Sequence, residues 1–174
     1  MVSFDISHQE YEEALASLHR LCPDLKKVDI TIEFGADHKH SKVLRDFVGS
    51  IFDAHGIFAP WRGRFILITD ELVNNAIEHG SAAWDLDSCV IHAEKGSDGL
   101  FSIGIEVHDT GNGKDSGKAK DMISIKKEHT PDGDEVYMEK RGRGLFYITE
   151  RLVDTMEFSE SPKGWLAVKV EKKI

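Results

Sequence analysis

The sequence lacks the features of a secreted or membrane protein. It has only two cysteines, Cys22 and Cys89, which form no CxxC pair and no disulfide framework. No apolar run approaches the roughly 18 residues that cross a membrane. The N-terminus MVSFDISHQE has neither the basic nor the apolar region of a signal peptide. We therefore expect a protein of the reducing cytoplasm that makes no membrane contact.

An excess of basic residues is also missing. The formal net charge is −9, whereas a nucleic-acid-binding domain normally carries a basic stripe. The charge therefore argues against direct nucleic-acid binding. It is compatible with the docking of basic partner proteins, although solubility is the commoner reason for an acidic surface.

The first half of the chain shows helical and strand periodicities in turn. An amphipathic helix is predicted over about residues 7–21, with Ser7 and Glu10 in the spacing of a capping box. VDITIEFGA alternates as a half-buried strand does. Two helices follow, one over about residues 38–54 and one in RFILITDELVNNAIEH that ends at Gly80.

The second half is richer in strands. SCVIHAEKG and LFSIGIEVHDTG are predicted strands, joined by a turn at Gly96–Gly99. GLFYITERLVD is predicted as a short helix, and TMEFSES and WLAVKVEKK as a closing hairpin. Hairpins with the helices grouped between them indicate an α+β two-layer sandwich: a mixed, mostly antiparallel sheet with helices on one face. We expect one domain over residues 1–174.

Residues Lys114 to Arg141 interrupt this order with many charges and glycines and no sustained periodicity. Loops longer than about 15 residues are uncommon in compact domains and are usually lids, binding loops or disordered segments.

Three short stretches carry candidate chemistry, and the first is ELVNNAIEHG, residues 71–80. Glu71, Asn75, Glu78 and His79 have the spacing of one helix face. A carboxylate and an amide oxygen on one face suit Mg²⁺, which takes one or two protein ligands and leaves water and phosphates to complete its shell. The alternative is a solvated polar face.

The second stretch is VHDTGNG, in which an apolar strand runs into Asp109. Gly111 and Gly113 allow positive φ and close approach of a ligand to the backbone. A buried carboxylate at this strand end can accept a hydrogen bond from an exocyclic amine. A plain turn after a strand is the alternative.

The third stretch is RGRGLFYI, where Gly142, Arg143 and Gly144 precede a predicted helix. Free backbone N–H groups, the helix dipole and a cationic side chain are the components of a phosphate site. Neither a P-loop nor a dinucleotide fingerprint is present. A purely structural glycine junction is therefore an alternative for this stretch.

Taken together and in this order, the stretches resemble the N, G1 and G2 boxes of the GHKL (Bergerat-fold) ATPase superfamily. Within it, DELVNNAIEHG, DTGNG and GRGLFYITERLVD are similar to the small bacterial anti-sigma-factor serine/threonine kinases. The resemblance covers roughly residues 28–172. The helix over about residues 7–21 is additional to the family pattern, and no family role transfers to it.

The resemblance implies ATP and Mg²⁺ as cofactors, and it implies roles for single residues. Glu71 is the implied catalytic base, and Asn75 the implied Mg²⁺ ligand. Asp109 would hold the adenine amino group, while Gly111 and Gly113 would shape the pocket floor. The set implied to meet the phosphates is Gly142, Arg143 and Gly144, and the lid would span residues 114–141. Asn74 lies about 100° around the helix from Asn75 and receives a supporting role only.

The implied function is an ATP-dependent serine/threonine protein kinase that acts as an anti-sigma regulatory factor. Its substrate would be a serine of an anti-sigma antagonist protein, with a sigma factor as a competing partner and a homodimer as a further expectation. The alternative is a non-catalytic partner-binding switch, which has less use for Glu71. About 27 residues precede the first predicted strand, too few for the dimerisation segment of a histidine kinase. Zinc at His38 and His40 is disfavoured because no third ligand follows at suitable spacing.

Overall fold

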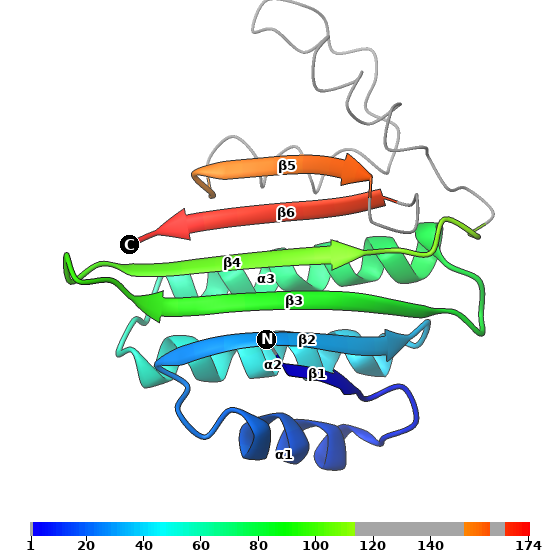
Figure 1. The fold of residues 1–174 in the computed structure, drawn as a ribbon, viewed down its shortest axis with the longest axis horizontal. Helices are drawn as coiled ribbons and strands as arrows, with labels where there is room; N and C mark the ends of the chain where they lie inside the picture. Colours follow the sequence, from blue (N-terminus) through cyan, green and yellow to red (C-terminus); the bar gives the residue numbers. More distant parts are fainter. Residues whose placement is uncertain (1, 114–151, 161–165) are drawn as a thin grey trace, which may run out of the picture.

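The computed structural model describes residues 2–113, 152–160 and 166–174 (Figure 1). These residues form a six-stranded sheet with the spatial order β1-β2-β3-β4-β6-β5. The strands are β1 (Val2–Asp5), β2 (Lys27–Gly35), β3 (Leu86–Lys95), β4 (Phe101–His108), β5 (Thr155–Glu160) and β6 (Leu166–Lys173). The helices are α1 (Tyr11–Leu21), α2 (His38–Ala54), α3 (Trp61–Asn75) and the π-helix η1 (Ala76–Gly80). β1 is parallel to β2, and every other neighbouring pair of these strands is antiparallel.

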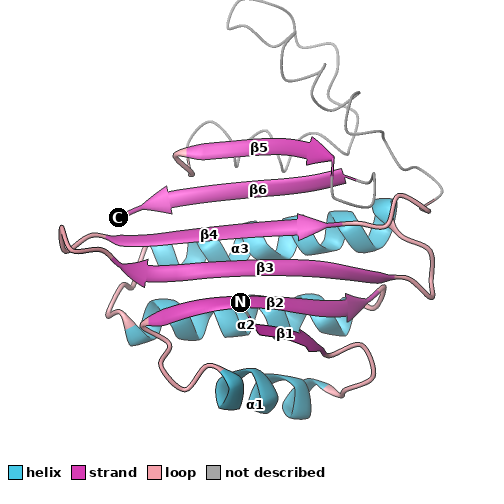
Figure 2. Cartoon of the chain, in the orientation of Figure 1, coloured by secondary structure: helices cyan, strands magenta, loops and turns pink. Residues whose placement is uncertain are grey.

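The described residues make two layers, with α2 and α3 against one face of the sheet (Figure 2). Each inner strand turns alternate side chains toward these helices. In β2 the buried residues are Val28, Ile30, Ile32 and Phe34, and in β4 burial also alternates along the strand. The mixed, mostly antiparallel sheet with helices on one face confirms the predicted α+β two-layer sandwich.

The core forms between this sheet face and the apolar stripes of α2 and α3. Phe47 and Ile51 from α2 and Phe65 and Ile68 from α3 are fully buried, as is Ile105 of β4. Burying a side chain of this size contributes about 1.5–3 kcal/mol. These contacts fix α3 along the sheet, so its C-terminal end lies where β3 begins and β4 ends (Figure 1).

The N-terminal segment differs from the prediction. The strand β1 was not predicted, because four residues with mostly exposed side chains carry no detectable alternation. The helix α1 begins at Tyr11 rather than near Ser7, and its N-cap, Glu10, makes no side-chain capping bond. The Ser7 N–H instead donates to Asp5 Oδ1 at 2.7 Å, and the Ile6 N–H extends the pairing with β2 by donating to Glu33 O. The predicted capping box is therefore wrong, because Ser7 lies in the turn that follows the β1–β2 pairing and the helix begins only at Tyr11.

The other elements among the described residues match the prediction more closely. The bounds of α2 are those predicted, and its N-cap Asp37 accepts a hydrogen bond from the Lys39 N–H at 2.9 Å. The β3–β4 turn lies at Gly96–Gly99, where Gly99 has a φ of 81°. β5 and β6 pair as the closing hairpin. Most of the short helix predicted in GLFYITERLVD falls outside the described residues. None of the described helices has the length and apolar character needed to span a bilayer.

Candidate functional site

Glu71 and Asn75 lie one turn apart in α3, as the sequence predicts for a shared helix face. Both residues are half-buried. Within the described part of the chain, neither side chain makes a hydrogen bond or an ion pair. As far as the described residues go, an amide oxygen and a carboxylate are therefore available on the same side of α3.

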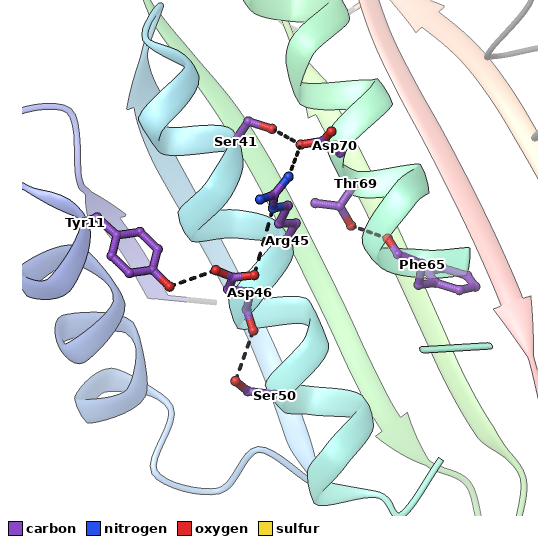
Figure 3. A network of polar contacts seen from close by, with 8 residues as sticks. All are labelled: Tyr11, Ser41, Arg45, Asp46, Ser50, Phe65, Thr69 and Asp70. Carbon is purple, nitrogen blue, oxygen red and sulfur yellow. Dashed lines mark hydrogen bonds and ion pairs between the residues drawn. The ribbon is translucent and has the colours of Figure 1, made fainter. Parts of the chain in front are cut away.

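The neighbouring residues Asp70 and Asn74 face α2 instead. Asp70 Oδ1 accepts a hydrogen bond from the Ser41 hydroxyl at 2.7 Å and one from Arg45 Nη1 at 3.4 Å (Figure 3). Asn74 Oδ1 accepts one from His38 Nδ1 at 3.0 Å. The two adjacent asparagines thus have different environments, and Asn74 joins α3 to the start of α2.

The predicted helix face does not continue past Asn75 as an α-helical face. Residues Ala76–Gly80 form the π-helix η1, whose i→i+5 bonding changes the angular spacing of the side chains. Glu78 is exposed and lies 3.9 Å from His38 Nε2, on the side of Asn74. The expectation that Glu78 and His79 share the face of Glu71 was based on α-helical spacing, and the π-turn removes that basis.

Asp109 follows directly after β4 and is held by backbone groups. Its N–H donates to Leu166 O at 3.1 Å, which extends the β4–β6 pairing by one residue. Its Oδ1 accepts hydrogen bonds from the N–H of Gly111 at 3.0 Å and of Leu166 at 3.4 Å. Burial raises the pKa of Asp109, and these two N–H donors and His108 oppose the rise. Among the described residues Oδ2 has no hydrogen-bonding partner, so this oxygen can accept a bond from a ligand.

The loop after Asp109 packs against η1 with almost no space between the two backbones. A Cβ at Gly113 would overlap the carbonyl oxygen of His79, and the Gly113 N–H donates to Gly80 O at 3.1 Å. Gly111 has a φ of 66°, a left-handed conformation that favours glycine. The predicted box of Asp109, Gly111 and Gly113 therefore lies against the end of the helix that carries Glu71 and Asn75.

The sequence interpretation missed Gly80 as a residue of this contact. It was interpreted only as the end of a helix, but a Cβ at this position would overlap the Cβ and Oδ2 of Asp109. Gly80 is not among the glycines with positive φ. The glycine is thus needed for space rather than for a left-handed cap, and no local sequence signal distinguishes these two requirements.

A carboxylate from the preceding loop fixes the other side of the DTGNG segment. Asp85 Oδ2 accepts hydrogen bonds from the Thr110 hydroxyl at 2.6 Å, the Ala82 N–H at 2.9 Å and Asn112 Nδ2 at 3.2 Å. These donors lower the pKa of Asp85, the Thr110 hydroxyl most of all. Thr110 itself is buried. Asp85 was not predicted as a site residue, because nothing in SAAWDLD indicates a contact with a loop 25 residues away.

The remaining predicted site residues, Gly142, Arg143 and Gly144, lie outside the described residues, as does the lid predicted over residues 114–141. Among the residues that the structure describes, no group of three or more His, Cys, Asp or Glu side chains is arranged to hold a metal ion. His38 bonds to Asn74, and His40 Nδ1 donates to Gly35 O at 2.9 Å. Both histidines of the HxH motif therefore have structural partners.

A separate hollow of about 520 Å³ lies at the sheet, and its lining includes His92, Gly104 and Glu106. Its lining contains none of the candidate site residues. Two of its charged side chains neutralise each other, because Lys169 Nζ lies 2.7 Å from Glu171 Oε1. We therefore assign the candidate site to the contact between η1 and the Asp109 loop, where free polar atoms and close backbone packing coincide.

Comparison with known proteins identifies the family and a similar fold. The family model described as the histidine kinase-like ATPase domain matches residues 34–168, which leaves out β1, α1 and most of β2. A chain in the crystal structure of the SiaB–SiaC complex from Pseudomonas aeruginosa has a similar fold, with a TM-score of 0.50 and 10% sequence identity. The alignment covers 92% of this chain and 98% of that chain. A search of curated proteins gave no match. Because the family model spans most of the sequence, the protein belongs to the histidine kinase-like ATPase domain family.

Proposed function

We propose that this protein is an ATP-dependent serine/threonine protein kinase of a partner-switching system, acting in the cytoplasm as an anti-sigma regulatory factor. Its substrate is a serine of an anti-sigma antagonist protein. The proposal rests on membership of the histidine kinase-like ATPase family and on the similarity of the three sequence boxes to the anti-sigma kinases.

The observation that carries the proposal is the close docking of the Asp109 loop on η1. Gly80 and Gly113 bring this loop to the end of the helix that carries Glu71 and Asn75. A base-recognising carboxylate and a metal-binding amide are thereby joined through a short, tightly packed connection. This is the arrangement expected if one nucleotide contacts both groups.

The described residues fit an adenine nucleotide. Asp109 Oδ2 has no partner among them and is available to accept a hydrogen bond from the adenine amino group. Asn75 supplies an amide oxygen to Mg²⁺, which prefers oxygen ligands and takes few of them from proteins. Gly142, Arg143 and Gly144 are proposed to bind the phosphates. Bound ATP supplies the phosphoryl group that is transferred.

Glu71 is proposed to act as the general base. Phosphoryl transfer depends mainly on positioning and charge neutralisation, together with a carboxylate near the acceptor hydroxyl. The Glu71 side chain lies on the same face as Asn75, and no other described side chain binds it. It is therefore free to accept the hydroxyl proton of the substrate serine while Asn75 faces the nucleotide.

The partner assignment follows the resemblance to the anti-sigma kinases, with a sigma factor as the competing partner and a homodimer as the state of this chain. The similar solved chain comes from a complex of two proteins, SiaB and SiaC. This supports a role for the present chain that also depends on a protein partner.

Calorimetric titration with Mg·ATP, beside Asp109→Asn, tests the nucleotide site. We expect micromolar binding by the wild type and a loss of at least about tenfold in the variant, because an acceptor oxygen is exchanged for an amide that also donates. Equal affinities of the wild type and Asp109→Asn for Mg·ATP would show that adenine is bound elsewhere, and would overturn the Asp109 assignment. Absence of binding by the wild type would overturn the kinase and favour a nucleotide-free switch.

A second measurement separates a kinase from a nucleotide-dependent switch. Radiolabelled γ-phosphate of ATP is followed into the anti-sigma antagonist protein of the same organism, and the labelled residue is identified by mass spectrometry. Labelled serine supports the kinase. Tight Mg·ATP binding with no labelled antagonist would show that the chain acts by binding alone.

A further inference from the structure

A second buried carboxyl group lies beside the Asp109 loop, at the start of β3. The inward-facing positions of β3 are Asp87, Cys89, Ile91 and Ala93, and all four are buried. Asp87 is the only polar residue among them and is 1% exposed. An apolar residue would fill this position without desolvating a carboxyl group, so packing alone does not explain an aspartate here.

The partners of Asp87 connect it to the candidate site. The Ser81 hydroxyl donates a hydrogen bond to Asp87 Oδ1. The same Ser81 oxygen accepts one from the Thr110 N–H at 3.3 Å. Thr110 lies between Asp109 and Gly111, so a chain of two hydrogen bonds runs from the interior of β3 to the backbone beside Asp109.

These two hydrogen bonds hold the Asp109 loop from a different side than Asp85 does. Asp85 binds the side chains of Thr110 and Asn112, whereas Ser81 binds the Thr110 backbone next to the Asp109 carbonyl. The backbone contact constrains the peptide that follows Asp109. It therefore influences the direction of the Asp109 side chain, whose Oδ2 has no other described partner.

We propose that Ser81 and Asp87 are positioning residues that hold Asp109 in the geometry required to bind the nucleotide base. The inference rests on the proposed function, because it assigns these residues to the same nucleotide site. It adds two residues outside the three sequence boxes, and they act through the backbone of Thr110 rather than by contact with the nucleotide.

The groups around Asp87 indicate which of its two protonation states holds Asp109 in position. Asp87 Oδ2 is buried and has no hydrogen-bonding partner among the described residues. Within the part of the chain that the structure describes, the charged groups that act on Asp87 are two further carboxylates, Asp109 and Asp85. Its neighbour across the sheet in β2 is the apolar Phe34. Burial, with a smaller contribution from the two carboxylates, raises the pKa of Asp87 to about 7, and the Ser81 hydrogen bond only partly opposes this rise.

An ionised Asp87 would add negative charge beside Asp109 with no described cation to offset it. A bound nucleotide is also anionic, so binding favours the neutral acid at Asp87. Nucleotide affinity should therefore fall as the pH rises through about 7 and Asp87 loses its proton. Asp87→Asn keeps an oxygen that accepts the Ser81 hydrogen bond and cannot ionise, so it should remove this dependence.

The test uses Mg·ATP titrations of the wild type, Ser81→Ala, Asp87→Ala and Asp87→Asn. Either alanine variant breaks the chain of hydrogen bonds through Ser81. The Kd for Mg·ATP should then rise about tenfold at pH 6.5, a value at the upper end for one hydrogen bond. Asp87→Asn should stay within about twofold of the wild type at that pH. The control is Asp98→Asn, a carboxylate in the β3–β4 turn at the other end of the same strands, which should bind as the wild type does.

A pH series adds a readout that a purely structural role would not change. The ratio of the wild-type Kd to the Asp87→Asn Kd is measured from pH 5.5 to 8.5, which cancels the titration of the nucleotide itself. The ratio should rise several-fold as the pH passes about 7. A flat ratio would overturn the protonation assignment.

The variants also separate this inference from the proposed function. If the wild type binds Mg·ATP and Asp109→Asn does not, while folded Ser81→Ala and Asp87→Asn bind as the wild type at every pH, the positioning role is wrong and the nucleotide site stands. If Asp87→Ala does not fold, Ser81→Ala decides alone, because Ser81 is only partly buried. If the wild type binds no nucleotide, the proposed function fails first.

Discussion

Helix α3 carries two pairs of polar residues, each spaced by four, and the pairs differ in what they contact. Asp70 and Asn74 face α2, where Ser41 and Arg45 bind the first and His38 binds the second. Figure 3 shows Asp70 as the α3 end of a network that continues along α2. The contacts of Asp70 and Asn74 on this side join α3 to α2.

The second pair, Glu71 and Asn75, is offset from the first by a single residue. Both side chains are half-buried, and neither is bonded within the described residues. Among these residues, neither side chain has a buried atom without a partner, so water or a ligand can complete their hydrogen bonds. The two pairs are similar in composition but differ in role. Asp70 and Asn74 attach α3 to α2, whereas Glu71 and Asn75 are available to bind a ligand.

The largest effect expected from this comparison concerns Glu71. Glu71→Gln should lower phosphoryl transfer to the antagonist protein by about 10²–10⁴-fold, because the amide cannot act as a general base. Mg·ATP affinity should change little. Asp70→Asn is the matched control, since it changes the same functional group one residue away and should retain transfer.

Single-turnover transfer of labelled phosphate measures both variants. If Asp70→Asn lost transfer to the same degree as Glu71→Gln, the distinction between the two faces of α3 would be incorrect. If Glu71→Gln kept full transfer, the base would be another residue.

The next largest effect concerns the buried carboxyl group of Asp87, whose Oδ2 has no hydrogen-bonding partner among the described residues. Its pKa is about 7 in the folded protein, above the ordinary value of 3.8. The folded state therefore holds a proton that the unfolded chain loses as the pH rises above 3.8. The contribution of Asp87 to the free energy of unfolding should therefore fall between about pH 4 and pH 7, by at most about 4 kcal/mol, and level off above pH 7.

Urea unfolding of the wild type and Asp87→Asn across this range isolates the contribution of Asp87. The variant should become more stable relative to the wild type as the pH rises. A difference that stays constant with pH would show that Asp87 has an ordinary pKa in the folded protein.

A smaller effect is expected from the close packing of the Asp109 loop on η1. Gly113→Ala forces a methyl group into the His79 carbonyl, and neighbouring backbone must shift. Overpacking of this kind costs about 1–3 kcal/mol. Nucleotide affinity should fall with it, because the loop that carries Asp109 can no longer dock.

Gly63→Ala is the control for this substitution. Gly63 lies in α3, and a Cβ there meets nothing within 4 Å. Alanine is the better helix former, so this variant should gain about 0.5 kcal/mol of stability. Thermal unfolding and Mg·ATP titration of both variants would contradict the packing argument if Gly113→Ala behaved like Gly63→Ala.

The sequence could predict what local pattern determines. The apolar spacing of α2 defines that helix within residues 38–54, and the glycine-rich turn defines the β3–β4 hairpin. The same kind of pattern selected Glu71, Asn75 and Asp109 as candidates. Spacing could not predict contacts between distant segments, and Ser81 and Thr110 are 29 residues apart in the chain.

Two features that the sequence did not predict, the role of Gly80 and the strand β1, have the same physical cause. Gly80 satisfies the expectation for a helix end, and only the position of Asp109 reveals that its lack of a Cβ is required. Residues Val2–Asp5, most of which are exposed, form a strand because β2 offers an edge to pair with. Tertiary contacts determine both features, and no window of neighbouring residues contains them.

The smallest effect distinguishes the two adjacent asparagines directly. Asn74→Ala removes the hydrogen bond with His38, a loss of about 1 kcal/mol that the higher helix propensity of alanine offsets by about half. Asn75→Ala loses no bond within the described residues, so only the propensity gain of about 0.5 kcal/mol remains. The two variants should therefore change the free energy of unfolding in opposite directions.

The affinity for Mg·ATP separates the same two residues. It should be unchanged in Asn74→Ala and weakened in Asn75→Ala. Stability changes of the same sign, or equal affinities, would mean that the pairing of Asn74 and the availability of Asn75 do not separate structure from function on α3.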